Sequence, residues 1–376
     1  MICLIVTQKQ YEAMLRSFRE LYIRVDLLDF KTDAKLQEIQ GVCIDGNVNI
    51  NASSNNRRIA NVKFAMADES FTVGQDRKFW INKKIRIFTG LMDYTAGEIV
   101  WFLQGSFLIN NPTISISASD KTVSFDALDY MCLIDGTMNG SLGQITEHVP
   151  VLPISESIKS LITQLVGINS YNIEPNEFYA EYTIRKSATD TKFSIIKELS
   201  DMYMDYEFFF DENGVFVYRR IRNYEEDPIL WDFRDTNHLI ISHSVTSDFS
   251  NVKNCVQVWG RVSNGAQLQY YVENTDLNNP YNVFSDIGKR LFTYQNDKIY
   301  TYEQIKARGD YELKQHCSYN DKLVLDTVPI YSLDANQIIF FKDLESPQYT
   351  GRYLIDTISF PLSHDGVMNL SAYRIY

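Results

Sequence analysis

The chain has 376 residues, which is enough for two or three domains with cores of their own. Its apolar share of 45% and charged share of 22% are ordinary for a globular protein. A formal net charge of −12 argues against a nucleic-acid binder that grips phosphates, but it fits a conduit whose walls repel nucleic acid.

Residues 1–19 are predicted to form an N-terminal arm with a strand and a helix. Over residues 8–18, the apolar side chains Tyr11, Met14, Leu15 and Phe18 fall on one helical face. Two interpretations stay open for this amphipathic helix. It either covers the edge of a sheet or docks on a neighbouring subunit.

Residues 20–136 are predicted to form a first β-barrel domain. From Leu21 the apolar pattern takes the period of two, and turns rich in Asn, Gly, Ser and Asp separate the segments. Pro112 fits the start of a strand after a bulge or turn. Strands are expected at 21–30, 41–50, 57–66, 84–91, 98–109, 113–119 and 122–128.

Residues 137–225 are predicted to form a mixed α/β domain. One helix is expected to begin with Ser155 as its N-cap and to end at Gly167, and a second follows Asp190. Asn213-Gly214 lies between two apolar runs, 206–210 and 215–221, which is a strong signal for a tight hairpin.

Residues 226–376 are predicted to form a second β-barrel domain with an insertion at about 263–318. The chain closes on a hairpin whose turn is expected to use Asp365 and Gly366 at positive φ. We expect the chain to end on this structure, with no tail or appended enzyme. Whether the two β regions are related copies stays open. Strands are expected at 239–245, 254–261, 323–329, 337–341, 352–360 and 367–376, and a helix at 302–316.

The predicted fold class is therefore mainly β with α+β insertions. It consists of two tube-like β-barrel domains and a mixed α/β domain.

Searching the sequence for chemistry yields no catalytic, cofactor-binding or metal-binding residue. The phosphate-binding, dinucleotide-binding, zinc-protease and nucleophile-elbow motifs are all missing from it. His238 and His243 lie five apart on a predicted strand, so their side chains would point to opposite faces and make poor metal co-ligands. The sequence thus predicts a protein that is not an enzyme and holds no cofactor.

The cysteines and the N-terminus point to a reducing compartment. Met1–Val6 is a short apolar run with no basic segment before it and no cleavage site, so we expect no signal peptide. No stretch approaches the length of a membrane span. We expect folding in a cytoplasm, with five scattered thiols and no disulfide framework: Cys3, Cys43, Cys132, Cys255 and Cys317.

An alternative function is a carbohydrate-binding or glycoside-hydrolysing β protein that acts on cell-surface polysaccharide. A glycosidase needs two facing carboxylates, and Asp126 with Asp129 or Asp232 with Asp235 would be candidates. Acid-rich turns are also common in acidic β proteins. Four tryptophans could form a sugar-binding platform, although packing in a core or at a subunit interface is the favoured interpretation, because each lies near Phe or Val in or next to a predicted strand: Trp80, Trp101, Trp231 and Trp259.

Four stretches of the chain resemble the baseplate hub and tail-tip proteins of tailed bacteriophages, a family that includes the N-terminal hub region of tail-associated lysins. They occur in the order and spacing of that family and together span nearly the whole chain from about residue 20. They are Lys84–Gly90 with Trp101–Phe107 and Val123–Asp129; Ile195–Leu199 with Tyr206–Tyr218; Ser250–Gly260; and Tyr353–Leu362 with Gly366–Tyr373.

The resemblance implies a homotrimer in the virion tail, assembled in the bacterial host cytoplasm. Each subunit would contribute two barrels to a ring of six, which joins the sixfold tail tube to a threefold central spike or tip. Implied partners are the distal tail or tail tube protein, the tape-measure protein, and central spike or receptor-binding proteins.

DNA would pass through this ring without specific binding, past surfaces that are neutral or negative, and no stable membrane insertion is implied. Many members of the family extend into a peptidase or lytic domain. Because this chain stops at the closing hairpin, we expect no peptidoglycan-cleaving activity.

Overall fold

The computed structural model describes residues 7–16, 19–203, 206–263, 265–318 and 321–375. The fold is mainly β, as the sequence predicts. Strands from both ends of the chain build one large sheet. They are β1 (Leu21–Asp29), β2 (Lys35–Gln40), β3 (Cys43–Asn51), β4 (Arg58–Ala65), β5 (Lys83–Asp93), β6 (Glu98–Ile116), β7 (Lys121–Leu128), β13 (Ile229–Asp232), β14 (Ile240–Ser247), β18 (Asp321–Thr327), β19 (Ile338–Phe341), β20 (Gly351–Pro361) and β21 (Met368–Ile375).

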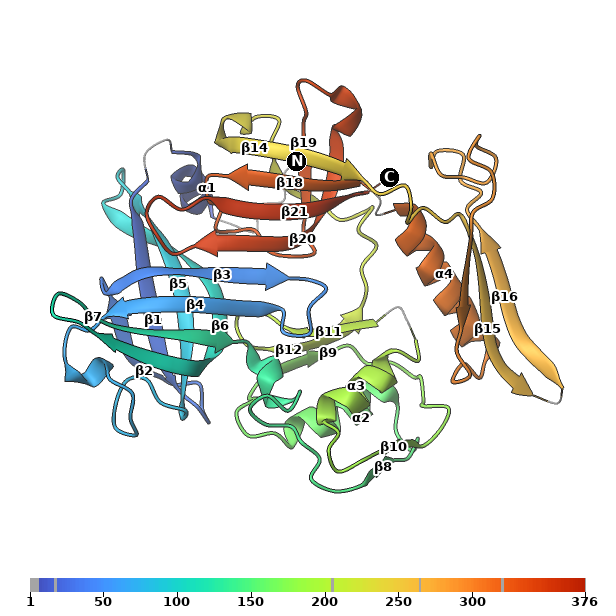
Figure 1. Ribbon diagram of the computed structural model, residues 1–376, viewed down its shortest axis with the longest axis horizontal. Coiled ribbons are helices and arrows are strands. Elements are labelled where there is room, and N and C mark those ends of the chain that lie inside the picture. The colour runs from blue at the N-terminus through green and yellow to red at the C-terminus, as the bar shows by residue number, and fades with distance from the viewer. Residues whose placement is uncertain (1–6, 17–18, 204–205, 264, 319–320, 376) are drawn as a thin grey trace.

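The order of strands in this sheet is β14-β18-β21-β20-β3-β4-β7-β6-β5-β1-β2, with β19 beside β20 and β13 beside β19. Figure 1 shows β14, β18, β21, β20, β3, β4 and β7 stacked in this order from top to bottom. The predicted closed barrels are not found, because within the described residues the sheet has two open ends, β14 and β2. The division of the chain into four domains stays a prediction.

The two β regions have the same strand order. One runs β3-β4-β7-β6-β5-β1, and the other runs β14-β18-β21-β20-β19-β13. Strands at the same place in these two orders also come at the same place in the sequence of their region. Four of the five neighbour pairs match in direction, all antiparallel. The fifth differs, because β1 is antiparallel to β5 whereas β13 is parallel to β19. The chain therefore contains an internal structural repeat.

The two repeats meet edge to edge, through an antiparallel pairing of Thr357–Pro361 in β20 with Asn47–Asn51 in β3. Alternating side chains from both repeats enter one shared apolar cluster, in which Val48 and Ile358 are buried. Thus strands that are some three hundred residues apart in sequence form one continuous sheet and one core.

The predicted α/β unit is present as a compact cluster below the sheet in Figure 1. The hairpin at Asn213-Gly214 is confirmed, and Gly214 has φ +79°. The predicted cap is wrong: the first helix is preceded by Pro153, and Ser155 is buried inside it. Gly167 lies beyond the helix end. The elements are α2 (Ile154–Thr163), α3 (Lys192–Ser200), β8 (Thr146–His148), β9 (Tyr171–Ile173), β10 (Ile184–Lys186), β11 (Tyr206–Phe210) and β12 (Phe216–Arg220).

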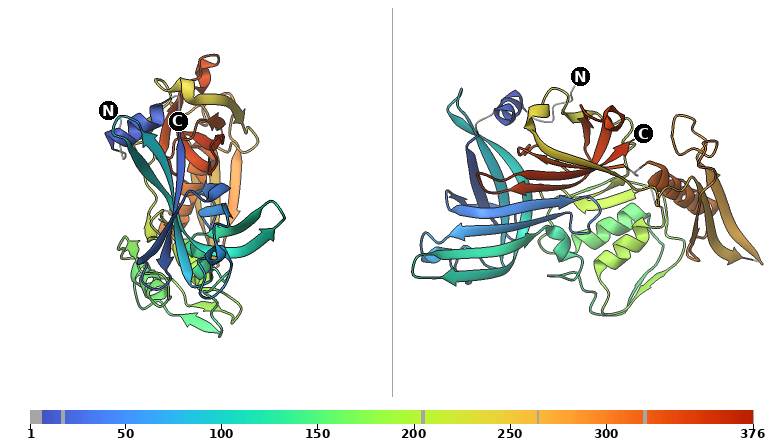
Figure 2. Two further views of the ribbon diagram at one scale, coloured as in Figure 1. Left: turned by 90° about the vertical axis from the view of Figure 1, so that its left-hand side faces the viewer. Right: turned by 45° about the horizontal axis from the view of Figure 1, so that its top comes forward.

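A separate module, which we call the satellite, lies at the right of Figure 1. It consists of the sheet β16-β15-β17 with one helix packed on it. The predicted helix at 302–316 is confirmed, but the strand expected at 254–261 belongs to this module and not to the large sheet, as the right-hand view of Figure 2 also shows. The inserted module therefore begins earlier than the predicted residue 263. Its elements are β15 (Cys255–Ser263), β16 (Ala266–Glu273), β17 (Leu291–Gln295) and α4 (Tyr302–Ser318).

The N-terminal helix α1 (Gln8–Leu15) is confirmed, and a capping box at Thr7 and Gln10 begins it. It packs on β5 and β6, and the ring of Tyr11 lies 5.4 Å from that of Trp231. Phe18 and residues 1–6 of the predicted arm lie outside the described residues.

The closing hairpin is confirmed, but its turn works differently from the prediction. Neither Asp365 nor Gly366 has positive φ. Gly366 is needed for space, because a Cβ there would lie 2.1 Å from Cβ of Pro361. Among the described residues, no helix is long and apolar enough to cross a membrane.

Candidate functional site: the polar face of the continuous sheet

Eight strands, from β14 through β20 and β3 to β6, present one uninterrupted outward surface, which we call the polar face. Cross-strand partners place its side chains on the same side of the sheet, because residues that face one another across a ladder share a face. Its polar members include Asp45, Asn47, Asn49, Asn51, Asn61, Lys63, Asn110, Thr113, Ser115, Thr122, Ser124, Asp126, Ser242, Ser244, Thr246, Lys322, Asp326, Thr357, Ser359, Asn369, Ser371 and Tyr373.

The charges on the polar face nearly cancel, since its two lysines, Lys63 and Lys322, lie among three aspartates, Asp45, Asp126 and Asp326. The rest of its polar members are amides and hydroxyls. A chain with a net charge of −12 thus keeps this long surface close to neutral. Such a surface offers few cations to hold phosphates and little charge to repel them.

Hydrogen bonds tie neighbouring strands together across the polar face. The carboxylate of Asp326 accepts from the Ser242 hydroxyl at 2.7 Å and from the Asn369 amide at 2.8 Å. These bonds lower the pKa of Asp326, because they stabilise its charged form. The Asn61 amide donates to Asp126 at 2.8 Å in the same way. The side chains are therefore held in place and not free to reach outward.

Two buried arginines fix the α/β unit beneath this sheet. The Arg58 guanidinium donates to the carbonyl of Phe210 at 3.1 Å and pairs with the Asp334 carboxylate. Arg57 donates to the carbonyl of Ala335 at 3.0 Å, and its guanidinium lies 4.0 Å from the centre of the Phe209 ring. One dipeptide thus joins both β repeats and the α/β unit.

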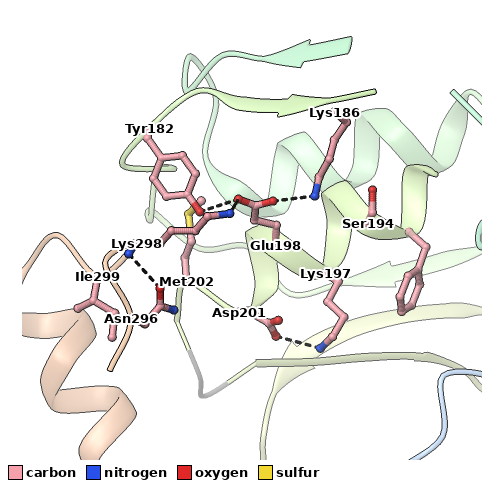
Figure 3. Close-up of a pocket in the computed structure, with 11 residues that line it drawn as sticks. Tyr182, Lys186, Ser194, Lys197, Glu198, Asp201, Met202, Asn296, Lys298 and Ile299 are labelled. Atoms are coloured by element: carbon pink, nitrogen blue, oxygen red, sulfur yellow. Dashed lines mark hydrogen bonds and ion pairs between the residues drawn. The ribbon is translucent and has the colours of Figure 1, made fainter. Parts of the chain in front are cut away.

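Figure 3 shows an open pocket of about 390 Å³ where the α/β unit meets the satellite. Glu198 on α3 is at its centre. Its carboxylate accepts from the Tyr182 hydroxyl at 2.8 Å and pairs with Lys186 at 2.8 Å and with Lys298 of the satellite at 2.6 Å. Burial alone would raise the pKa of Glu198, but these three partners outweigh it and lower the pKa to about 2.

This arrangement acts as a latch and offers no reactive group. The Glu198 carboxylate is held ionised, and its bonds occupy both lysines. The rings of Tyr182 and Tyr300 stack beside it at 5.3 Å, which adds a second contact between the α/β unit and the satellite.

The carboxylate pairs considered in the sequence do not face a common cleft. Asp126 lies on the polar face, whereas Asp129 is buried and caps the following turn through the amide of Met131 at 3.0 Å. Burial raises the pKa of Asp129 to about 6. Asp232 is paired with its neighbour Arg234. The structure therefore gives no support to a glycosidase pair.

The four tryptophans are not brought together either. Trp231 is buried against Tyr11 and Phe233, while Trp101 stacks under Arg24 at 4.8 Å. Trp80 lies in the loop before β5, and Trp259 lies in the satellite. No sugar platform spans them.

Histidines and cysteines show no metal-binding geometry in the described part of the chain, where no group of three or more ligand-type side chains is found. His243 instead bonds Asp343 at 3.1 Å. The described cysteines are free thiols, as predicted: Cys43, Cys132, Cys255 and Cys317.

Sequence reasoning missed the polar face, although one signal was available. After a bulge in each strand, β6 reads Thr113-Ile114-Ser115 and β20 reads Thr357-Ile358-Ser359 at the equivalent place. This short match marks the internal repeat.

No protein-family model and no curated protein matches the sequence. Solved structures do match it. The 43 kDa tail protein of prophage MuSo2 from Shewanella oneidensis is 12% identical, with a TM-score of 0.61 over 94% of this chain and 98% of that one. The tail protein from Neisseria meningitidis MC58 is 11% identical, with a TM-score of 0.63 over 94% and 96%.

A third match is a chain of the Francisella PdpA–VgrG complex in its half-lidded form. It is 9% identical, with a TM-score of 0.57 over 95% of this chain and 58% of that chain. Nearly the whole described chain, including both repeats, is thus covered by proteins whose sequences have diverged almost completely. The chain has the fold of phage tail proteins.

Proposed function

We propose that this protein is the structural hub of a phage or phage-like tail, and that three copies form a ring between the sixfold tail tube and a threefold spike or tip. It acts through symmetry matching and channel formation, and not as an enzyme. Its partners are the distal tail or tube protein, the tape-measure protein and central spike or receptor-binding proteins, in the virion tail.

The observation that carries this proposal is the internal repeat. A chain with two units of the same strand order, joined side by side, presents two similar surfaces to its surroundings. Three such chains around an axis present six. Closed cyclic symmetry of this kind is the usual way in which soluble subunits assemble.

The polar face supports DNA passage. Because its charges nearly cancel and two of its aspartates are bound to neighbouring side chains, it suits the wall of a channel through which a polyanion slides. We place this face toward the ring axis.

A symmetric reconstruction of the purified assembly tests the proposal. The expected result is a threefold ring with the polar face around a central opening. A ring of another symmetry, or a threefold ring with the polar face on its outer side, would contradict it.

A further inference from the structure

The strand β6 has an edge that its own chain leaves unpaired. Along that edge β5 pairs with β6 only as far as Leu108, and the remaining residues continue past it. On its other edge, β6 stays paired to β7 from Leu108 to Ile116. In the described structure, the last residues of β6 therefore offer backbone donors and acceptors to a further strand.

The internal repeat shows what such an edge does. In the other repeat, β20 is the counterpart of β6, and it too has one edge paired to β21 throughout. Its second edge pairs first with β19 and then, from Thr357 onward, with β3 of the neighbouring repeat. The equivalent part of β6 begins at Thr113, directly after the matching bulge.

Exposure of the side chains agrees with a missing neighbour. Ile358 and Phe360, on β20, are 2% and 0% exposed because the adjoining repeat covers them. Their counterparts Ile114 and Ile116, on β6, are 38% and 68% exposed. Uncovered isoleucines on an open, uncharged edge mark a surface made for pairing.

The internal repeat also indicates which strand would be the partner of this edge. The counterpart of β3 is β14, which ends the large sheet and pairs on one side only, with β18. Its sequence, from Ile240 to Ser247, holds no Asp, Glu, Lys or Arg. By contrast the other end of the sheet, β2, carries Lys35 and Glu38, charges of the kind that block strand addition.

We infer that residues 113–116 of β6 pair antiparallel with residues 247–250 of a second copy, at the end of β14, repeating between chains the junction that β20 and β3 form within one. The contact is heterologous, so it closes into a ring when the rotation allows. Ile114 and Ile116 then become buried, and the polar face continues across the boundary. This inference rests on the proposed ring.

Cysteine cross-linking of the full chain tests this pairing. Ser115→Cys is combined with Asp248→Cys, and Thr113→Cys with Ser250→Cys, because these positions correspond to Ser359 with Asn49 and Thr357 with Asn51, and cross-strand partners lie within disulfide reach. Mild oxidation should give cross-linked dimers and trimers for at least one combination and none for the single variants. Ser359→Cys with Asn49→Cys, a pair within one chain, is the positive control and adds no mass.

A second variant separates the interface from general effects. Ile116→Asp should lower the cross-linking yield about tenfold or more, because it would bury an unpaired charge in the junction. Ile145→Asp, at an equally exposed isoleucine outside the junction, should leave the yield unchanged. Light scattering on the same samples measures their mass.

The outcomes distinguish the two proposals. A threefold assembly without these cross-links would overturn the strand pairing and leave the ring intact. A chain that neither associates nor cross-links at its highest soluble concentration would overturn both.

Discussion

At the scale of single residues, Arg58 holds together three parts of the chain that are far apart in sequence. Its side chain is almost fully buried, and its partners are the carbonyl of Phe210 in the α/β unit and the carboxylate of Asp334 in the second repeat. A guanidinium is suited to this place because its planar fork donates in several directions and keeps its charge.

Arg58→Met should lower the free energy of unfolding by about 2 kcal/mol, because it fills the same volume but leaves a carboxylate and a buried carbonyl without a donor. The urea midpoint of the purified chain measures this. Arg185→Met, which removes an exposed ion pair with Glu147, is the matched control and should have little effect. Equal midpoints for the two variants would argue against a special role for Arg58.

Glu198 gives a residue-scale prediction with a defined pH dependence. Its pKa in the folded protein is about 2, below the ordinary glutamate value that the unfolded chain has. The stability contributed by its ionised form is therefore present above the unfolded pKa and is lost as the pH falls toward the folded one.

We expect Glu198→Gln to be less stable than the parent chain above about pH 5, with a difference that shrinks steadily between about pH 4.5 and pH 2. Urea midpoints over a pH series check this. The control is Glu156→Gln, which removes an exposed ion pair with Lys159 on the same helix. A difference that stays constant down to pH 2 would show that the latch depends on shape and not on charge.

At the scale of elements, local signals predicted most strands and helices but not their partners. The Asn-Gly hairpin and the amphipathic α4 carry their patterns in consecutive residues. The edge strand β2 was missed because only one of its side chains, Ile39, is buried, so no period of two appears. The β20–β3 junction lies beyond any local pattern, because its partners are separated by some three hundred residues.

The candidate site could not be predicted for the same reason, because it depends on which strands pair and not on a local sequence pattern. Single residue types could be searched for chemical motifs in the sequence, but the partners that bind Asp129 and Asp232 could not be predicted from it. The polar face, in contrast, exists only once eight strands are in order. Its members are ordinary Asn, Ser and Thr residues, which become a surface through pairing alone.

The satellite gives an element-scale prediction. It is inserted between β14 and β18, the counterparts of β3 and β4, which a turn at 52–57 joins. Ser247 and Asp321, which flank the insertion, are direct partners across the ladder, so a short turn can connect them. The satellite core is a separate small apolar cluster.

Replacing residues 251–320 with the sequence of the 52–57 turn should therefore leave a chain that folds cooperatively and still forms the proposed ring, because residues 247–250 of the inferred junction are kept. Circular dichroism during thermal unfolding, together with light scattering, would measure both properties. The latch variant Glu198→Gln is a useful comparison, since it loosens the satellite without removing it. Loss of cooperative unfolding in the deletion would mean that the satellite is an integral part of the main core.

At the scale of the whole molecule, the internal repeat and the nearly neutral polar face together would decide how the proposed ring treats DNA. The chain holds most of its excess negative charge away from this face, where two lysines lie among three aspartates. In a threefold ring, each substitution on the face appears three times around the axis. Small changes there should have large effects on passage.

Asn49→Lys should convert the channel from one that ignores DNA to one that binds it. Asn49 is exposed on β3 at the junction of the two repeats, so three added lysines would line the opening and contact phosphates. Anisotropy of short labelled duplexes with the purified ring should show binding that weakens steeply with salt, with a steeper log–log slope for each added contact. Asn49→Gln keeps the amide and should not bind, and Ser54→Lys places the same charge on an exposed turn beyond the strands. If the Ser54→Lys and Asn49→Lys variants bind DNA equally, the polar face does not line the channel. If the parent ring already binds DNA tightly at low salt, its wall is not the inert surface that free passage requires.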